Sequence, residues 1–192
     1  MTMQDCESNN KHDIDSMVLA MMDLQPSLLS AIKDSAQLID SCEIALRAFR
    51  LLNLPVVLTE QVPSKLGRTH EKLRSLISPS DLIFEKDSFS AFGCEQFVRH
   101  LKSHDFNHLI LTGVETSICI YLTAISAIKH GLNVTILSDA VSGRRECDAI
   151  DIFHDLRERG ISIIPLETFL YSLLHSSNHP CFRDISVMIR QR

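Results

Sequence analysis

The chain alternates short aliphatic runs with segments whose apolar residues recur at helical spacing. The six predicted strands cover residues 17–22, 56–59, 82–84, 109–111, 133–139 and 161–164. Continuous aliphatic runs of this length are typical of parallel strands that are buried on both faces. Helices between successive strands favour right-handed crossovers. The pattern therefore predicts an α/β fold with a doubly wound, six-stranded parallel sheet in the common order 3-2-1-4-5-6.

The composition is that of one globular domain. Of the 192 residues, 45% are hydrophobic and 22% are charged, so the chain can bury a stable core without disulfides. We expect a polar, frayed segment at residues 1–14 and a single domain over residues 15–192. The net charge of −5 provides no positive surface for nucleic acid or for an anionic membrane. It favours a small neutral or cationic molecule as the binding partner.

The six cysteines, at positions 6, 42, 94, 119, 147 and 181, contain no C-x-x-C pair and no zinc-ligand spacing. We therefore expect reduced thiols. The first sixteen residues are acidic and show neither a secretory signal nor an Arg-rich transit peptide. No apolar run approaches the length that spans a bilayer. These features predict a cytoplasmic protein.

Residues 107–122 place one of these cysteines in a position suited to chemistry. The strand at 109–111 is followed by Gly113, which predicts a tight turn, and by an apolar helix that Thr116 would cap. Cys119 would then be the third helical residue, where unpaired backbone N–H groups and the helix dipole stabilise a thiolate. The alternative is an inert, buried cysteine, which is the commoner case in such chains.

A carboxylate follows the first predicted strand, because Asp23 comes directly after residues 17–22. In a sheet of order 3-2-1-4-5-6, the first and fourth strands are neighbours where the winding direction reverses, and ligands bind at the carboxyl ends of strands there. Asp23 and Cys119 should therefore face one crevice. In the alternative interpretation, Asp23 only caps the next turn.

Three short segments resemble the isochorismatase-like cysteine hydrolase superfamily. They are Met-Met-Asp-Leu-Gln at 21–25, Lys-Asp-Ser-Phe-Ser-Ala-Phe at 86–92 and Gly-Val-Glu-Thr-Ser-Ile-Cys at 113–119. Further similarity at 59–61, 138–141 and 167–174 extends the resemblance over nearly the whole domain. The resemblance is greatest to the small single-domain hydrolases of the superfamily. It implies a Rossmann-like three-layer α/β/α sandwich, in agreement with the strand pattern.

The resemblance also implies a Cys-Asp-Lys triad, and this chain has all three residue types at the matching positions. Cys119 would be the nucleophile that forms a covalent thioester, and Asp23 would act as general base and acid. Lys86 would keep Asp23 ionised through its positive charge. The backbone N–H groups of Glu115 and Cys119 would form an oxyanion hole, next to a cis peptide bond between Val114 and Glu115.

Two departures from members of the superfamily narrow the expected chemistry. Nicotinamidases of the superfamily hold a metal with an Asp-x-His pattern after the second strand, where this chain has Thr-Glu-Gln at 59–61, so we expect no metal and no cofactor. True isochorismatases lack the nucleophilic cysteine, so the resemblance favours hydrolysis of a small amide, imide or ester. The expected substrate pocket includes Gln25, Phe89 and Thr116. The resemblance also suggests a homo-oligomer, either a dimer or a larger assembly.

Three histidines offer a weaker interpretation as a metal site. His100, His104 and His108 are spaced by four residues, which on one continuous helix would place them on a single face. However, the helix should end near Ser103, and His108 should enter the fourth strand. We therefore favour a solvated helix terminus over a shared metal ion.

Two other classes of function remain open from the sequence. An inactive family member could persist as an oligomeric binding or scaffold protein, although its triad positions are intact. A role in RNA processing is disfavoured by the acidic charge and by the lack of a basic, aromatic surface pattern. Arg144 and Arg145 follow the fifth strand and could bind an anionic substrate group. Contact with solvent or with an oligomer partner is the favoured interpretation for both arginines.

Overall fold

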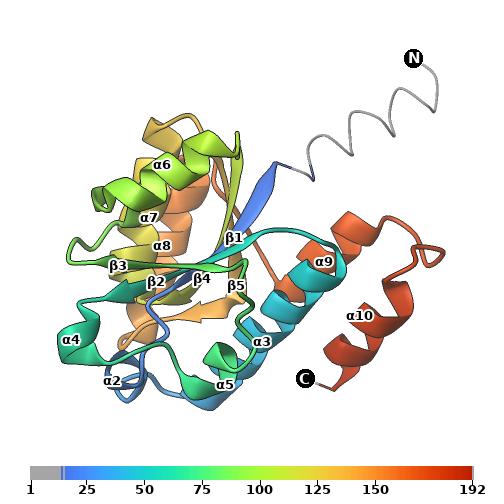
Figure 1. The fold of residues 1–192 in the computed structure, drawn as a ribbon, viewed down its shortest axis with the longest axis horizontal. Helices are drawn as coiled ribbons and strands as arrows, with labels where there is room; N and C mark the ends of the chain where they lie inside the picture. Colours follow the sequence, from blue (N-terminus) through green and yellow to red (C-terminus); the bar gives the residue numbers. More distant parts are fainter. Residues whose placement is uncertain (1–13, 15, 192) are drawn as a thin grey trace.

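The computed structural model describes Ile14 and residues 16–191, and a parallel sheet forms its centre (Figure 1). The segment predicted to be frayed, residues 1–14, lies outside this part apart from Ile14. The strands are β1 Met17–Met22, β2 Val56–Gln61, β3 Leu82–Lys86, β4 His108–Val114, β5 Asn133–Ser142 and β6 Ser162–Ile164. All neighbouring strands are parallel, and their order is β3-β2-β1-β4-β5-β6, as the sequence pattern predicted.

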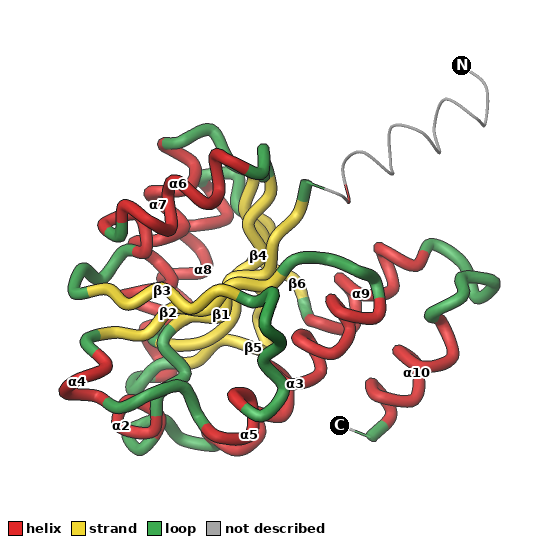
Figure 2. The backbone as a smooth tube through the Cα atoms, viewed as in Figure 1, coloured by secondary structure: helices red, strands yellow, loops and turns green. Residues whose placement is uncertain are grey.

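Helices cover both faces of the sheet and complete the predicted three-layer sandwich (Figure 2). They are α2 Pro26–Leu29, α3 Ser35–Leu51, α4 Pro63–Leu66, α5 Glu71–Arg74, α6 Glu95–Ser103, α7 Tyr121–Lys129, α8 Glu146–Glu158, α9 Leu166–Leu174 and α10 Phe182–Arg190. Helices α3, α9 and α10 lie on one side of the sheet, and α6, α7 and α8 lie on the other. Within the described part of the chain, no helix is both long and apolar enough to cross a membrane.

Both faces of the central strand are buried. Along β1, Leu19 and Met21 pack into the core beneath α3, whereas Val18, Ala20 and Met22 pack into the core beneath α6 and α7. Each of these five side chains is at most 1% exposed. A strand that is covered on both sides has no solvent-facing positions, which explains its unbroken apolar sequence.

Gly113 lies within β4, and the tight turn predicted there was wrong. The strand continues to Val114, and Gly113 has a φ of 109°, which disfavours any residue with a side chain. A Cβ atom at this position would lie only 2.1 Å from the carbonyl oxygen of Met22 on β1. The pairing of β4 with β5 also shifts register between Leu111 and Gly113. The chain therefore leaves the sheet only at Glu115, beside the carboxyl end of β1.

Strands β2, β3, β4 and β5 are longer than the sequence predicted, and the C-terminal tail contains a further helix. β2 continues past the predicted end at residue 59 and includes Glu60 and Gln61. The side chains of residues 59–61 are buried and have polar partners. β5 continues past Asp139, whose carboxylate accepts a hydrogen bond of 2.7 Å from the N–H of Leu166 at the start of α9. The tail contains α10, because its Ile185 and Ile189 are buried in the core that α3 and α9 share.

Candidate active site

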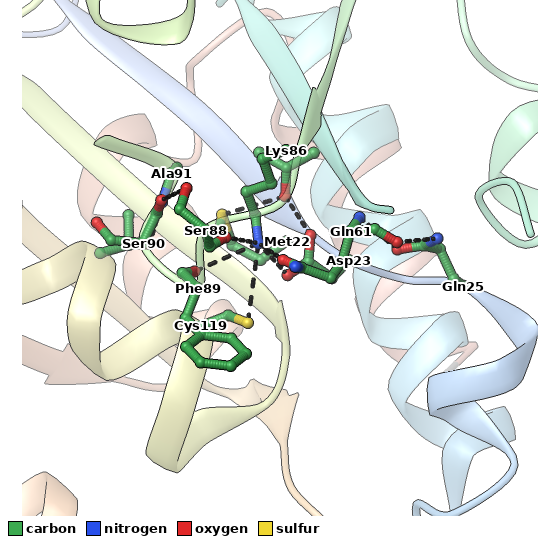
Figure 3. A network of polar contacts seen from close by, with 12 residues as sticks. Met22, Asp23, Gln25, Gln61, Lys86, Ser88, Phe89, Ser90, Ala91 and Cys119 are labelled. Carbon is green, nitrogen blue, oxygen red and sulfur yellow. Dashed lines mark hydrogen bonds and ion pairs between the residues drawn. The ribbon is translucent and has the colours of Figure 1, made fainter. Parts of the chain in front are cut away.

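The carboxyl ends of β1, β3 and β4 bring three polar side chains together (Figure 3). Asp23 follows β1, Lys86 ends β3 and reaches across β2, and Cys119 follows β4. Lys86 Nζ lies 2.8 Å from Asp23 Oδ2 and 3.9 Å from Cys119 Sγ. The side chains of Asp23 and Lys86 are fully buried, and Cys119 is 6% exposed. The order of the strands thus assembles one site from residues that are far apart in the sequence.

Asp23 is held at both of its carboxylate oxygens. Oδ1 accepts a hydrogen bond of 2.7 Å from the hydroxyl of Thr59, while Oδ2 faces Lys86. The Asp23 backbone has a left-handed φ of 52°, and its N–H donates to the carbonyl of Thr59. The next helix, α2, has Gln25 at its N-cap position and no side-chain cap. The carboxylate is therefore directed into the cluster and does not cap the following turn.

Lys86 is surrounded by oxygen atoms. Besides its contact with Asp23, Nζ lies 2.5 Å from Gln61 Oε1, 3.1 Å from the carbonyl oxygen of Ser88 and 3.3 Å from that of Phe89. An ammonium group has only three N–H donors, so these acceptors fully occupy it. The lysine is consequently fixed as a point charge between Asp23 and the nucleophile position.

Cys119 lies in a π-helical turn, Thr116–Ile120, that leads into α7. The N–H of Ile120 donates to the carbonyl of Glu115, five residues earlier, and Glu115 occupies the N-cap position. The predicted cap by Thr116 was therefore wrong, because this residue already lies inside the helical turn. Its hydroxyl is buried and makes no hydrogen bond to any residue that the structure describes.

The surroundings of Cys119 favour its neutral thiol. Burial raises the pKa of Cys119 to about 12, and the negative charge of Asp23 acts in the same direction, while Lys86 opposes them only in part. Interaction with the Asp23 carboxylate thus also keeps the proton on the sulfur. The stabilised thiolate predicted from the helix terminus was thus wrong for the resting protein, because desolvation and the neighbouring carboxylate outweigh the helix dipole.

The N–H group of Glu115, which was expected to form an oxyanion hole together with that of Cys119, adjoins the nucleophile position. The backbone of Glu115 lowers the pKa of Cys119, and the peptide bond between Val114 and Glu115 is cis. The Glu115 carboxylate forms an ion pair with Arg144, with Nε 2.8 Å from Oε1. Arg144, for which solvent or a partner contact was the favoured interpretation, therefore belongs to the site.

An open cavity of about 420 Å³ adjoins Cys119. Its lining residues are Leu28, Gln61, Val62, Lys65, Leu66, Phe89, Glu115, Ile118, Cys119 and Arg144. Of the three expected pocket residues, Phe89 lines this cavity, whereas Gln25 and Thr116 do not. The buried amide of Gln25 instead bonds to the backbone of Gln61 and Gly67, and it thereby holds the loop after β2.

Gln61 is a site residue whose role was not predicted from the sequence. Its Oε1 accepts a hydrogen bond from Lys86, its Nε2 donates to the carbonyl of Asp87 at 2.9 Å, and its side chain also lines the cavity. The Thr-Glu-Gln motif contains this residue, but in the sequence the motif speaks only against a metal site. The contact with Lys86 becomes evident once β2 is seen to lie between β1 and β3.

Glu60, at the centre of the same motif, is engaged with the protein. Its carboxylate accepts hydrogen bonds from the N–H and the hydroxyl of Thr69 and from Arg68. Although burial raises the pKa of Glu60, these hydrogen bonds outweigh that effect and hold the pKa below its ordinary value. Among the residues that the structure describes, no group of three or more His, Cys, Asp or Glu side chains could hold a metal ion. We interpret Glu60 as an anchor for the loop after α4.

The three histidines are separated by the end of a helix, as the sequence predicted. Helix α6 ends at Ser103, and His108 begins β4, where its Nε2 lies 2.9 Å from the hydroxyl of Thr135. His100 and His104 lie beside each other, with ring centroids 4.3 Å apart. This group lies away from Cys119 and does not line its cavity.

Comparison with known proteins agrees with this fold. Residues 17–167 match the family model described as the isochorismatase domain. An isochorismatase domain-containing protein 2 from Danio rerio is 33% identical over 174 residues, which cover 90% of this chain and 86% of that protein. The chain therefore belongs to the isochorismatase-like hydrolase family.

Solved structures share the same architecture. The MAR1 ribonuclease of Caenorhabditis elegans is 29% identical and superposes with a TM-score of 0.86 over 92% of this chain and 91% of its own. The YcaC gene product of Escherichia coli, described as an octameric hydrolase of unknown specificity, is 22% identical with a TM-score of 0.79. That alignment covers 93% of this chain and 95% of the YcaC chain, and at this identity it shows the fold alone.

Proposed function

We propose that this protein hydrolyses a small amide, imide or ester through a covalent thioester on Cys119. The observation that carries the proposal is the buried cluster of Asp23, Lys86 and Cys119 next to a cavity. Such a cluster provides a nucleophile, a proton acceptor and a fixed positive charge at one place. Membership of a hydrolase family supports the type of reaction.

In the first half-reaction, the sulfur of Cys119 attacks the substrate carbonyl while its proton moves to Asp23. This carboxylate already raises the pKa of the thiol, which fits a proton transfer that accompanies C–S bond formation. The N–H groups of Glu115 and Cys119 then stabilise the negative carbonyl oxygen. The C–N or C–O bond breaks next, the leaving group takes the proton from Asp23, and an acyl thioester remains.

In the second half-reaction, water attacks the thioester and gives its proton to Asp23. The C–S bond breaks, the sulfur recovers the proton, and the carboxylic acid product leaves. Lys86 stays charged throughout and stabilises the negative charge that passes between Asp23 and the sulfur. The cavity of about 420 Å³ admits only a small molecule at this position.

Detection of the acyl intermediate tests the proposal. The protein is incubated with 4-nitrophenyl acetate, quenched in acid and analysed by peptide mass spectrometry. We expect one acetyl group on Cys119, a burst of nitrophenolate, and no acetyl group on Cys42. Acetylation of Cys119 at no more than the level of the exposed Cys147 contradicts the proposal and favours the scaffold interpretation.

The name of the C. elegans neighbour makes ribonuclease activity a second candidate. This chain is 29% identical to that protein. The overall charge of −5 opposes RNA binding, and within the cavity only Lys65 and Arg144 are cationic. Incubation of RNA with the wild type and with Cys119→Ala separates the two functions. Cleavage that disappears in Cys119→Ala would support the ribonuclease, and the absence of cleavage by the wild type would exclude it.

We also propose that the protein is a homo-oligomer, a dimer or larger. The octameric state described for the E. coli neighbour supports this proposal. Multi-angle light scattering of the purified full chain measures the mass directly, and a mass that matches one chain of 21.7 kDa would contradict it.

A further inference from the structure

The wall of the cavity beside Cys119 combines apolar residues with a net positive charge. The apolar contributions come from Leu28, Val62, Leu66, Phe89 and Ile118. The charged residues are Lys65, Arg144 and Glu115, which sum to one positive charge. The whole chain carries −5, and this overall charge favoured neutral or cationic ligands. The local charge of the cavity therefore has the opposite sign to that of the protein.

Arg144 is oriented by Glu115 through only one of its nitrogen atoms. Nε lies 2.8 Å from Oε1 and 3.0 Å from Oε2 of this carboxylate. Neither terminal Nη group makes a hydrogen bond to any residue that the structure describes, and the side chain is 57% exposed. A guanidinium held in this way offers a planar pair of donors, which matches the two oxygens of a carboxylate.

Lys65 supplies a second cation on the same cavity. It lies in the last turn of α4, is exposed, and forms no ion pair within the described part of the chain. The chain just after it is anchored, because Gln25 Nε2 donates to the carbonyl of Gly67 at 2.5 Å. The ammonium therefore extends from a backbone that is held in place, while the side chain keeps its freedom to reach a ligand.

We infer that the substrates of this site carry a carboxylate, which Arg144 and Lys65 bind while the apolar wall holds the rest of the molecule. This inference rests on the proposed hydrolysis at Cys119 and names the class of substrate: a small amide, imide or ester with an additional free acid group. Arg144 is a specificity-determining residue in this arrangement, and Glu115 positions its guanidinium.

Alkylation of Cys119 tests the charge preference without requiring turnover. Iodoacetate and iodoacetamide deliver the same reaction with a negative and a neutral probe, so the ratio of their rates at Cys119 reports the local charge. The ratio is measured by peptide mass spectrometry in the wild type, Lys65→Gln and Arg144→Gln. Arg145→Gln is the matched control, because Arg145 is the neighbouring arginine, pairs with Asp148 and does not line the cavity.

We expect the iodoacetate-to-iodoacetamide ratio to fall about threefold in Lys65→Gln and about fivefold in Arg144→Gln. These factors correspond to the strength of ion pairs that are exposed to solvent. The ratio should also fall with added salt in the wild type and stay within about twofold in Arg145→Gln. A ratio that is unchanged in both Lys65→Gln and Arg144→Gln overturns the inference. If Arg144→Gln loses its iodoacetamide reaction through a local rearrangement at Glu115, the ratio in Lys65→Gln decides the question.

A pair of ester substrates connects the charge preference to hydrolysis. We expect 4-nitrophenyl hydrogen glutarate to have a higher kcat/KM than 4-nitrophenyl butyrate, and Arg144→Gln to remove this preference mainly through KM. If the iodoacetate-to-iodoacetamide ratio does not depend on Lys65 or Arg144 but the esters are still hydrolysed, only the carboxylate inference is overturned. Selective alkylation of Cys119 with no hydrolysis of either ester overturns the proposed function and retains the anion site.

Discussion

Cys42 and Cys119 are buried on opposite faces of the same sheet. Cys42 lies on α3 in the core that α9 and α10 complete, and it is 0% exposed. Cys119 lies on the face that α6, α7 and α8 cover, and it is 6% exposed. Burial raises the pKa of each thiol to about 12. Burial therefore disfavours the thiolate of both cysteines, although only one lies in a candidate active site.

The difference between them lies in their neighbours. The sulfur of Cys42 lies 3.5 Å from the carbonyl oxygen of Ala140, and the residue is completely buried in the core. The sulfur of Cys119 has a carboxylate that can accept its proton, a fixed ammonium at 3.9 Å and a cavity for a substrate. A low pKa is thus not what marks the candidate nucleophile in this protein. A proton acceptor, a counter-charge and access mark it instead.

Replacing each cysteine by alanine should give the largest contrast. In Cys119→Ala, kcat for 4-nitrophenyl acetate should fall by about 10⁴-fold or more, because the nucleophile is lost. In Cys42→Ala, kcat should stay within about twofold, while the free energy of unfolding in urea should fall by about 1 to 2 kcal/mol, since a small cavity remains. A Cys42→Ala protein that stays folded but loses turnover would contradict the comparison.

Removing the proton acceptor should have the next largest effect. Asp23→Asn keeps the shape of the side chain but cannot take the thiol proton, so kcat should fall by about 10²- to 10⁴-fold. Asp139→Asn is the matched control, because Asp139 is the carboxylate whose charge acts on Cys42. Turnover is measured well below the unfolding temperature of each variant, which circular dichroism determines. Equal losses in both variants would show that Asp23 has no specific role.

The rate of alkylation should depend on pH differently at the two buried cysteines and at an exposed thiol. Only thiolate reacts, so a raised pKa predicts slow iodoacetamide labelling of Cys119 at pH 8 and a rate that still rises at pH 10. Labelling should be about 50- to 100-fold slower than at the exposed Cys147, and Cys42 should stay unlabelled in the folded protein. Asp23→Asn removes a charge that raises the pKa, so it should accelerate labelling of Cys119 while it slows hydrolysis. Fast labelling of wild-type Cys119 below pH 7 would contradict this prediction.

Replacing the side-chain amide of Gln61, which accepts a hydrogen bond from Lys86, should have a smaller effect on kcat. Gln61→Met removes the acceptor at 2.5 Å from Nζ, and kcat should fall about tenfold, the usual loss for a hydrogen bond to a charged group. Gln25→Met is the control, because Gln25 anchors the loop without touching Lys86. In that variant KM should rise and kcat should stay within about twofold. A pH profile that shifts only in Gln61→Met would show that Gln61 acts through Lys86.

The positions of Asp23 and Cys119 could be predicted because they depend on strand order. Each follows an aliphatic run, and the doubly wound pattern makes β1 and β4 neighbours, so the two side chains had to meet at one edge of the sheet. The roles of Gln61 and Arg144 could not be predicted in this way. Their contacts depend on how side chains from adjacent strands and loops pack, which no spacing in the sequence reveals.

The alternation of strands and helices, their order, and the residues at the carboxyl ends of the strands follow from the amino-acid sequence alone. Hydrophobic periodicity and right-handed crossovers are local properties, and they act before the core is packed. The raised pKa of Cys119, the hold of Gln25 on a loop and the net positive charge of the cavity are visible only in the folded protein. The physical reason is that desolvation and charge–charge distances depend on which side chains the fold brings together.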